Sequence, residues 1–139
     1  MPQEIAEIML HRPPMLLIDE LISYDETRAT ARTTFSHERY GAENGFTSEP
    51  ALIECMAQTV AAQRGQLAYD KGISPQPGML VGVQNTEFHR PAEVDIPLNI
   101  DIEITHKLDN LYLVDCEITH RSERIVSGSL KFYAPEDTE

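Results

Sequence analysis

The chain is poor in the features that mark disulfide-built or membrane-bound proteins. Its 139 residues include two cysteines and no tryptophan, too few cysteines for a disulfide scaffold. No apolar run approaches the ~20 residues of a membrane-spanning helix. The first apolar stretch is short and is broken by Glu4, Glu7 and His11, so no signal peptide is expected. The sequence therefore predicts a cytoplasmic protein without a membrane segment.

Positive charge is also scarce. There are 11 Lys and Arg residues against 23 Asp and Glu residues, which gives a formal net charge of −12. A nucleic-acid partner requires a basic face, and an anionic membrane surface attracts basic segments. We therefore expect neither partner.

What is present is typical of one globular unit. Hydrophobic residues make up 41% of the chain and charged residues 24%. The length fits a single domain over residues 1–139 whose core needs no disulfide or metal. The sequence has no His-x-His, Cys-x-x-Cys or Gly-x-Ser-x-Gly pattern and no phosphate-binding glycine loop. We expect no metal ion and no cofactor.

A long helix is predicted in the middle of the chain. Ser48 is a good N-cap, Pro50 suits the first turn, and Gly72 can end the helix after Lys71. The first half of this helix is apolar all round, which predicts burial on every side.

Glu54 is the exception on this helix. Apart from the thiol of Cys55, nothing else between Pro50 and Ala62 can carry a charge at neutral pH. A carboxylate in apolar surroundings is paired, neutralised or used for chemistry. We expect burial to keep Glu54 in its acid form, while the alternative is a buried carboxylate held by backbone or arginine contacts.

The remaining elements are predicted to be mostly strands. Residues 2–9 favour a short helix, and residues 36–47 lack periodicity and have a length typical of a functional or disordered loop. Alternating or apolar runs predict strands over residues 15–24, 28–35, 79–89, 96–106, 111–120 and 125–133. One long helix with several antiparallel strands is an α+β arrangement.

Four stretches resemble, in order, the β-hydroxyacyl-acyl-carrier-protein dehydratase family (FabZ/FabA-like). They are His11 to Asp19 (HRPPMLLID), Pro50 to Gln58 (PALIECMAQ), Leu80 to Val83 with Phe88 to Pro91, and Ser127 to Phe132 (SGSLKF). The resemblance implies the hotdog fold, in which an antiparallel sheet wraps one central helix. It also implies a 3-hydroxyacyl thioester as substrate, on a carrier protein or coenzyme A.

The family pairs an acid on the central helix with a loop histidine from across a dimer interface. The resemblance places the acid at Glu54. The Gly-His-Phe-Pro-Gly type of loop is missing, so His37 and Tyr40 are the candidates for the second catalytic group. Gln58, one turn after Glu54, is expected to orient the carboxyl group. His11 is expected to have a structural role at the first strand.

The resemblance also suggests where the substrate binds. The acyl chain is expected between the helix N-terminus and the preceding loop, where Phe46, Leu52 and Met56 supply apolar surface together with Met79. Gly82, in the glycine-containing strand, completes the predicted substrate-binding set. A homodimer, or a heterodimer with a related subunit, is the expected assembly.

Three functions stay open at this point. The first is dehydration of 3-hydroxyacyl thioesters in fatty-acid or polyene-type lipid biosynthesis. The second is hydrolysis of acyl thioesters on the same fold, with Glu54 activating water. The third is a catalytically silent subunit that pairs with an active dehydratase, which the missing loop histidine favours.

Overall fold

The computed structural model describes residues 4–9, 11–74 and 78–135. Two helices, α1 (Ile5–Ile8) and α2 (Glu49–Lys71), accompany nine strands in that part of the chain. The strands are β1 (Glu20–Tyr24), β2 (Arg28–Thr34), β3 (Ala42–Glu43), β4 (Phe46–Thr47), β5 (Met79–Phe88), β6 (Ala92–Glu93), β7 (Pro97–Leu108), β8 (Leu111–His120) and β9 (Glu123–Tyr133).

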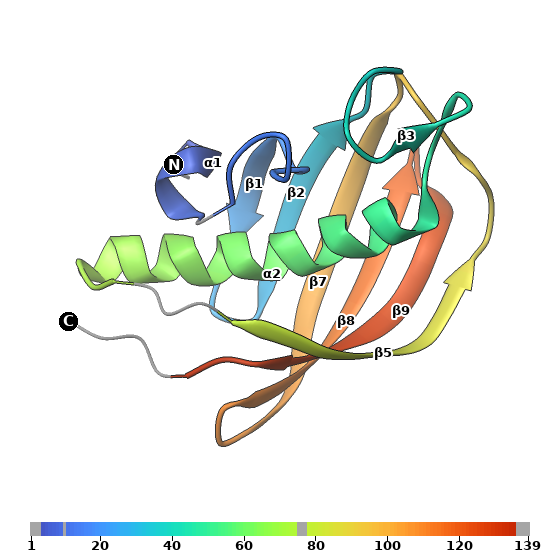
Figure 1. Ribbon diagram of the computed structural model, residues 1–139. Helices are drawn as coiled ribbons and strands as arrows, with labels where there is room; N and C mark the ends of the chain where they lie inside the picture. The colour runs from blue at the N-terminus through green and yellow to red at the C-terminus, as the bar shows by residue number, and fades with distance from the viewer. Residues whose placement is uncertain (1–3, 10, 75–77, 136–139) are drawn as a thin grey trace.

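Six strands form one antiparallel sheet that curves around α2 (Figure 1). Their order is β1-β2-β7-β8-β9-β5, so β5, which follows α2 in sequence, lies at the edge opposite β1. Strands β3, β4 and β6 form a separate small sheet near the N-terminal end of α2. The predicted α+β arrangement, one long helix wrapped by a sheet, is confirmed.

The ends of α2 follow the predicted signals. The Ser48 hydroxyl accepts a hydrogen bond from the Ala51 N–H at 3.3 Å, which satisfies one of the free donors of the first turn. Gly72 adopts the left-handed conformation with φ 70°, and the next N–H, from Ile73, donates to the Ala68 carbonyl at 3.1 Å. Glycine ends the helix here because it takes this conformation without steric cost.

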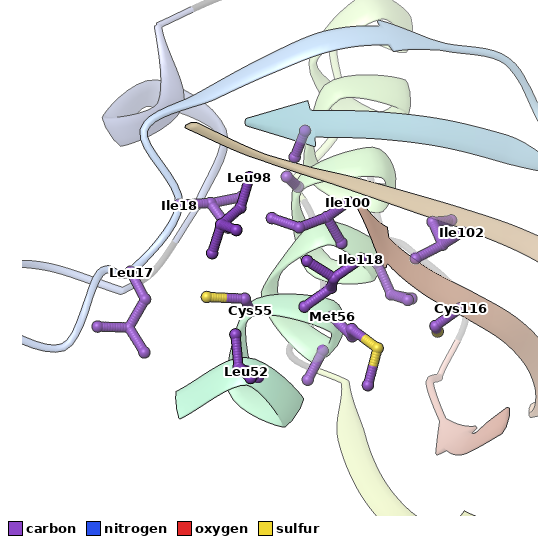
Figure 2. Close-up of a cluster of buried hydrophobic side chains, with 14 of the residues drawn as sticks. Leu17, Ile18, Leu52, Cys55, Met56, Leu98, Ile100, Ile102, Cys116 and Ile118 are labelled. Atoms are coloured by element: carbon purple, nitrogen blue, oxygen red, sulfur yellow. The ribbon is translucent and has the colours of Figure 1, made fainter. Parts of the chain in front are cut away.

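The core lies between α2 and the inner face of the sheet. Figure 2 shows Leu52, Cys55 and Met56 of α2 in one cluster with Ile100 and Ile118 of the sheet. All five side chains are at most 2% exposed. Burial of such side chains contributes roughly 25 cal/mol per Å² of apolar surface, so this contact holds α2 against the sheet.

Two sequence predictions need correction. The first strand begins at Glu20 rather than Met15, and the Leu17 N–H instead donates to the side chain of Gln58 at 2.8 Å. The irregular loop predicted over residues 36–47 contains β3 and β4, and β4 pairs with β6. Long-range pairing with β6, which the local sequence does not reveal, orders this segment.

Among the described residues, no helix combines the length and apolar character that crossing a membrane would need.

Candidate active site

Glu54 lies in the second turn of α2, on a face that the sheet does not cover. Its side chain is 42% exposed, so the expectations that the first half of α2 is buried on every side and that Glu54 is buried are wrong at this position. Because the first half of α2 lacks a polar face, its sequence cannot indicate which side is left open. The open side carries Glu54, Ala57 and Ala61 and borders a cavity.

Gln58 holds the carboxyl group of Glu54. Its Nε2 donates to Glu54 Oε1 at 3.3 Å and to the Met15 carbonyl at 2.7 Å. Its Oε1 accepts from the Leu17 N–H at 2.8 Å, and the residue is 1% exposed. The predicted contact between Gln58 and Glu54 is present, and Gln58 is itself fixed by two backbone groups.

His11 lies beside the same carboxyl group. Its Nε2 is 3.7 Å from Glu54 Oε1, and its Nδ1 is buried with no hydrogen-bond partner among the described residues. The sequence interpretation gave His11 a structural role and missed this proximity. The available signal was its place in the HRPP stretch, but no spacing rule connects that stretch to the second turn of α2.

A cavity of about 340 Å³ opens next to Glu54 and His11. Its walls come from the N-terminal segment, from α2, and from the start of β5 with the end of β9. The lining residues are Ile8, Met9, His11, Glu54, Ala57, Val60, Ala61, Arg64, Gly65, Gly78, Met79, Leu80 and Phe132. The walls are mostly apolar, and ionisable groups enter them from Glu54, His11 and Arg64.

The structure separates the residues predicted to bind the acyl chain. Met79 lines the cavity. Leu52 and Met56 lie on the opposite side of α2, 2% and 0% exposed in the core (Figure 2). Phe46 is 41% exposed on β4, and Gly82 lies in β5 beside Lys131 of β9. None of these last four lines the cavity.

His37 and Tyr40 lie in the segment that leads to the small sheet. His37 Nε2 is 3.5 Å from Asp95 Oδ2, and Tyr40 is 55% exposed. Within the described part of one chain, neither residue lines the cavity that Glu54 borders. A single chain therefore places His11, rather than His37 or Tyr40, next to the acid.

The two cysteines, Cys55 and Cys116, are buried free thiols. Burial raises the pKa of Cys55 to about 12 and also raises the pKa of Cys116. A thiol protonated at neutral pH is a poor nucleophile, so neither cysteine is suited to attack a thioester. Among the described residues, no group of three or more His, Cys, Asp and Glu side chains is placed to hold a metal ion.

Comparison with known families identifies the family of this chain. Residues 3–139 match the model of the ApeP-like family, described as ApeP dehydratase. The chain belongs to the ApeP-like dehydratase family. The FabZ/FabA-like resemblance is confirmed at the level of a divergent relative of those dehydratases.

Two curated relatives cover nearly the whole chain. An uncharacterized thioester dehydrase of Halalkalibacterium halodurans is 25% identical over 137 residues, covering 95% of this chain and 88% of the relative. The 3-hydroxyacyl-[acyl-carrier-protein] dehydratase FabZ of Latilactobacillus sakei is 29% identical over 136 residues, covering 94% and 95%.

Solved structures confirm the hotdog fold of this ApeP-like chain. The dehydratase heterocomplex ApeI:P from Xenorhabdus doucetiae superposes with a TM-score of 0.81 at 21% identity, covering 98% of this chain and 93% of that one. A hypothetical thioesterase from Streptococcus pneumoniae with coenzyme A gives a TM-score of 0.70 at 12% identity, covering 86% and 88%. At these identities the likeness concerns the fold alone.

Proposed function

We propose that this ApeP-like protein dehydrates 3-hydroxyacyl thioesters of an acyl carrier protein or coenzyme A, in fatty-acid or polyene-type lipid biosynthesis. The observation that carries the proposal is the Glu54 carboxyl group, held by Gln58 and 3.7 Å from His11, in the lining of a mostly apolar cavity. Such a cavity suits an acyl chain whose reacting carbons lie at the polar end. The family and its FabZ relatives give the reaction class.

The reaction needs one proton removed and one delivered. An imidazole takes the proton from C2 of the acyl chain, and Glu54 delivers a proton to the hydroxyl group on C3. The C3–O bond breaks, water leaves, and the C2–H electron pair becomes the C2=C3 double bond. His11 is the imidazole that a single chain supplies. Gln58 keeps the carboxyl group directed at the substrate, and water returns the two groups to their starting protonation states.

The catalytic unit is proposed to be a dimer in the cytoplasm, as a homodimer or with a related subunit. The outer edge strand β5 supports this, because it leaves Met79, Val81 and Val83 at 62%, 47% and 41% exposure, and an open apolar edge favours pairing with another strand. In this assembly, His37 and Tyr40 are proposed to reach the Glu54 of the second subunit. Phe46 and Gly82 are then candidate substrate contacts at the interface.

A second candidate function is that of a subunit that supports an active dehydratase without catalysing the step itself. The contact of His37 with Asp95, away from Glu54 of the same chain, favours this function. So does the similarity to one component of a dehydratase heterocomplex.

The test is product analysis with a 3-hydroxyacyl thioester, using the chain alone and the chain mixed with an active homologous dehydratase. An enoyl thioester from the pure chain supports the enzyme. An enoyl product only in the mixture, in larger yield than the homologue makes alone, supports the subunit. Free acid instead of enoyl product would establish the thioesterase alternative.

The imidazole assignment is tested separately. His11→Asn should lower dehydration by the pure chain about 100-fold or more, because it removes a proton acceptor of suitable strength. The matched variant His106→Asn changes an exposed histidine of β7 whose Nδ1 contacts Thr105, and it should have no effect. Equal activity of both variants would remove His11 from the mechanism.

A further inference from the structure

The N-terminal segment forms one wall of the cavity. Ile8 and Met9 are 3% and 5% exposed, and both line the cavity with His11. In Figure 1, α1 lies beside the C-terminal half of α2. The position of His11 therefore depends on how this segment is seated on α2.

Gly65 of α2 is the point of closest approach. A Cβ atom at this position would lie 1.8 Å from the Ile8 carbonyl oxygen and 2.8 Å from the Ile8 carbonyl carbon. Both atoms belong to backbone, so no side-chain rotation could relieve the overlap. The hydrogen that occupies the Cβ direction in glycine points at the carbonyl oxygen, a contact that recurs where helices approach closely.

This glycine is unfavourable for the helix that contains it. Gly65 lies well inside α2, where glycine is a weaker helix former than alanine. Its backbone has no positive φ that would call for glycine. The close approach of Ile8 is thus the feature of the structure that requires glycine at this position.

The contact with Ile8 extends to the active site through a short chain. Only a few residues separate Ile8 from His11, and each can span at most about 3.6 Å. The Arg12 guanidinium fastens the stretch by donating from Nη1 to the Met9 carbonyl at 2.6 Å. A shift of the Ile8 backbone is therefore passed on to the imidazole.

We propose that Gly65 is a positioning residue that seats the N-terminal segment on α2 and so holds His11 beside Glu54. Gly65→Ala displaces Ile8, moves the imidazole away from the carboxyl group and opens one wall of the cavity. The seating follows from the backbone contact alone. Its effect on turnover rests on the proposed dehydratase function.

The primary test does not use turnover. The imidazole resonances of His11 are assigned by NMR from their loss in His11→Asn, and their response to Glu54→Gln is measured. In the otherwise unchanged protein we expect a clear shift, because the carboxyl group that is exchanged for an amide lies 3.7 Å from the imidazole. In the Gly65→Ala background the shift should disappear, whereas an equal response in both backgrounds would overturn the proposal.

A second variant approaches the contact from the other side. Ile8→Ala removes a buried side chain of α1 and leaves α2 unchanged. Like Gly65→Ala, it should reduce the shift of the His11 resonances that Glu54→Gln causes. If Gly65→Ala does not fold, Ile8→Ala alone tests the seating role. A full response in Ile8→Ala, with a folded spectrum, would contradict the seating role.

Turnover adds a double-mutant cycle. Gly65→Ala should lower dehydration about tenfold in the unchanged protein and less than about twofold in the His11→Asn background, because residues that act together are not additive. Equal losses in both backgrounds would make Gly65 a general stability residue and overturn the positioning role. If the protein has no turnover under any condition, the proposed function fails and the NMR comparison still decides the role of Gly65.

Discussion

Two regions of this molecule present carboxylates differently: the outer face of the large sheet carries four in one ladder, and the lining of the cavity contains Glu54 alone among the described residues. On the outer face, Asp101 lies opposite Glu117 and Glu103 lies opposite Asp115 in the pairing of β7 with β8. Like charges directly opposite each other destabilise a sheet. Four acidic side chains in one ladder would by number alone look more functional than the single Glu54.

The partners of these carboxylates reverse that impression. Each acidic side chain of the ladder has a donor within 3.0 Å, from Arg28 to Glu103, Arg124 to Glu117, Thr30 to Asp101 and Ser129 to Asp115. Glu54 is held more loosely, at 3.3 Å from Gln58 and 3.7 Å from His11. The difference teaches that the number of carboxylates in a region does not measure how completely each one is paired, because Glu54 has longer contacts than any carboxylate of the ladder.

The largest expected effect is on activity. Glu54→Gln should lower dehydration roughly 10²- to 10⁴-fold, the usual contribution of a positioned proton donor. Glu117→Gln makes the same chemical change in the ladder and should leave the rate within about twofold. Steady-state kinetics on the purified protein measures both. Comparable losses in the two variants would abolish the distinction between the regions.

The next effect is on stability. Gln58→Leu leaves the Leu17 N–H and the Met15 carbonyl without their side-chain partner, which should lower the free energy of unfolding by about 2–4 kcal/mol. Ser129→Ala removes an exposed hydrogen bond to Asp115 and should change it by less than about 1 kcal/mol. Urea denaturation measures both values. A small loss for Gln58→Leu would show that water replaces the amide readily.

A smaller effect concerns pH at the far end of α2, where Asp70 is closely paired. The hydrogen bond from Tyr24 to Asp70 and partial desolvation raise the pKa of Tyr24. Because the folded pKa is raised, this stabilisation is full below the unfolded value of about 10 and is lost as pH rises through the folded value.

The comparison of the unchanged protein with Tyr24→Phe isolates this contribution. Urea unfolding between pH 8 and pH 11 should show the unchanged protein losing stability relative to Tyr24→Phe at the alkaline end. If the free energies of unfolding of the two proteins changed in parallel across that range, the stabilising pairing of Tyr24 with Asp70 would be contradicted. The difference in stability between the unchanged protein and Ser129→Ala should stay constant over this range, since the hydroxyl of Ser129 does not titrate there.

The smallest expected change is in thiol labelling. Cys55 follows Glu54 and Cys116 lies between Asp115 and Glu117, so each cysteine reports on the core beneath one of the two regions. Both are buried with raised pKa values, and neither should react with a thiol reagent at pH 8 until urea unfolds the protein. Faster labelling of Cys55 alone would mean that α2 opens locally at the active site.

Local sequence predicted most of the fold because its signals act over short distances. Ser48 and Gly72 delimit α2 as expected, and β8 runs from Leu111 to His120 as predicted. The small sheet was missed because β4 needs β6 as a partner, and a two-residue strand has no periodicity of its own. The first strand starts late because the side chain of Gln58 takes the Leu17 N–H.

In the candidate site, too, some features follow from local sequence and others from long-range contacts. Sequence alone singled out Glu54 as the candidate acid, through composition and the family resemblance. It also predicted the helix that carries Glu54 and the glutamine one turn later, through caps and helical spacing. Tertiary structure decided that Glu54 faces a cavity while Leu52 and Met56 enter the core. The sequence could not predict this, because the first half of α2 has no polar face that would distinguish the open side from the buried side. It also decided that His11 is the imidazole beside Glu54, because packing across Gly65, and no local pattern, brings those two segments together.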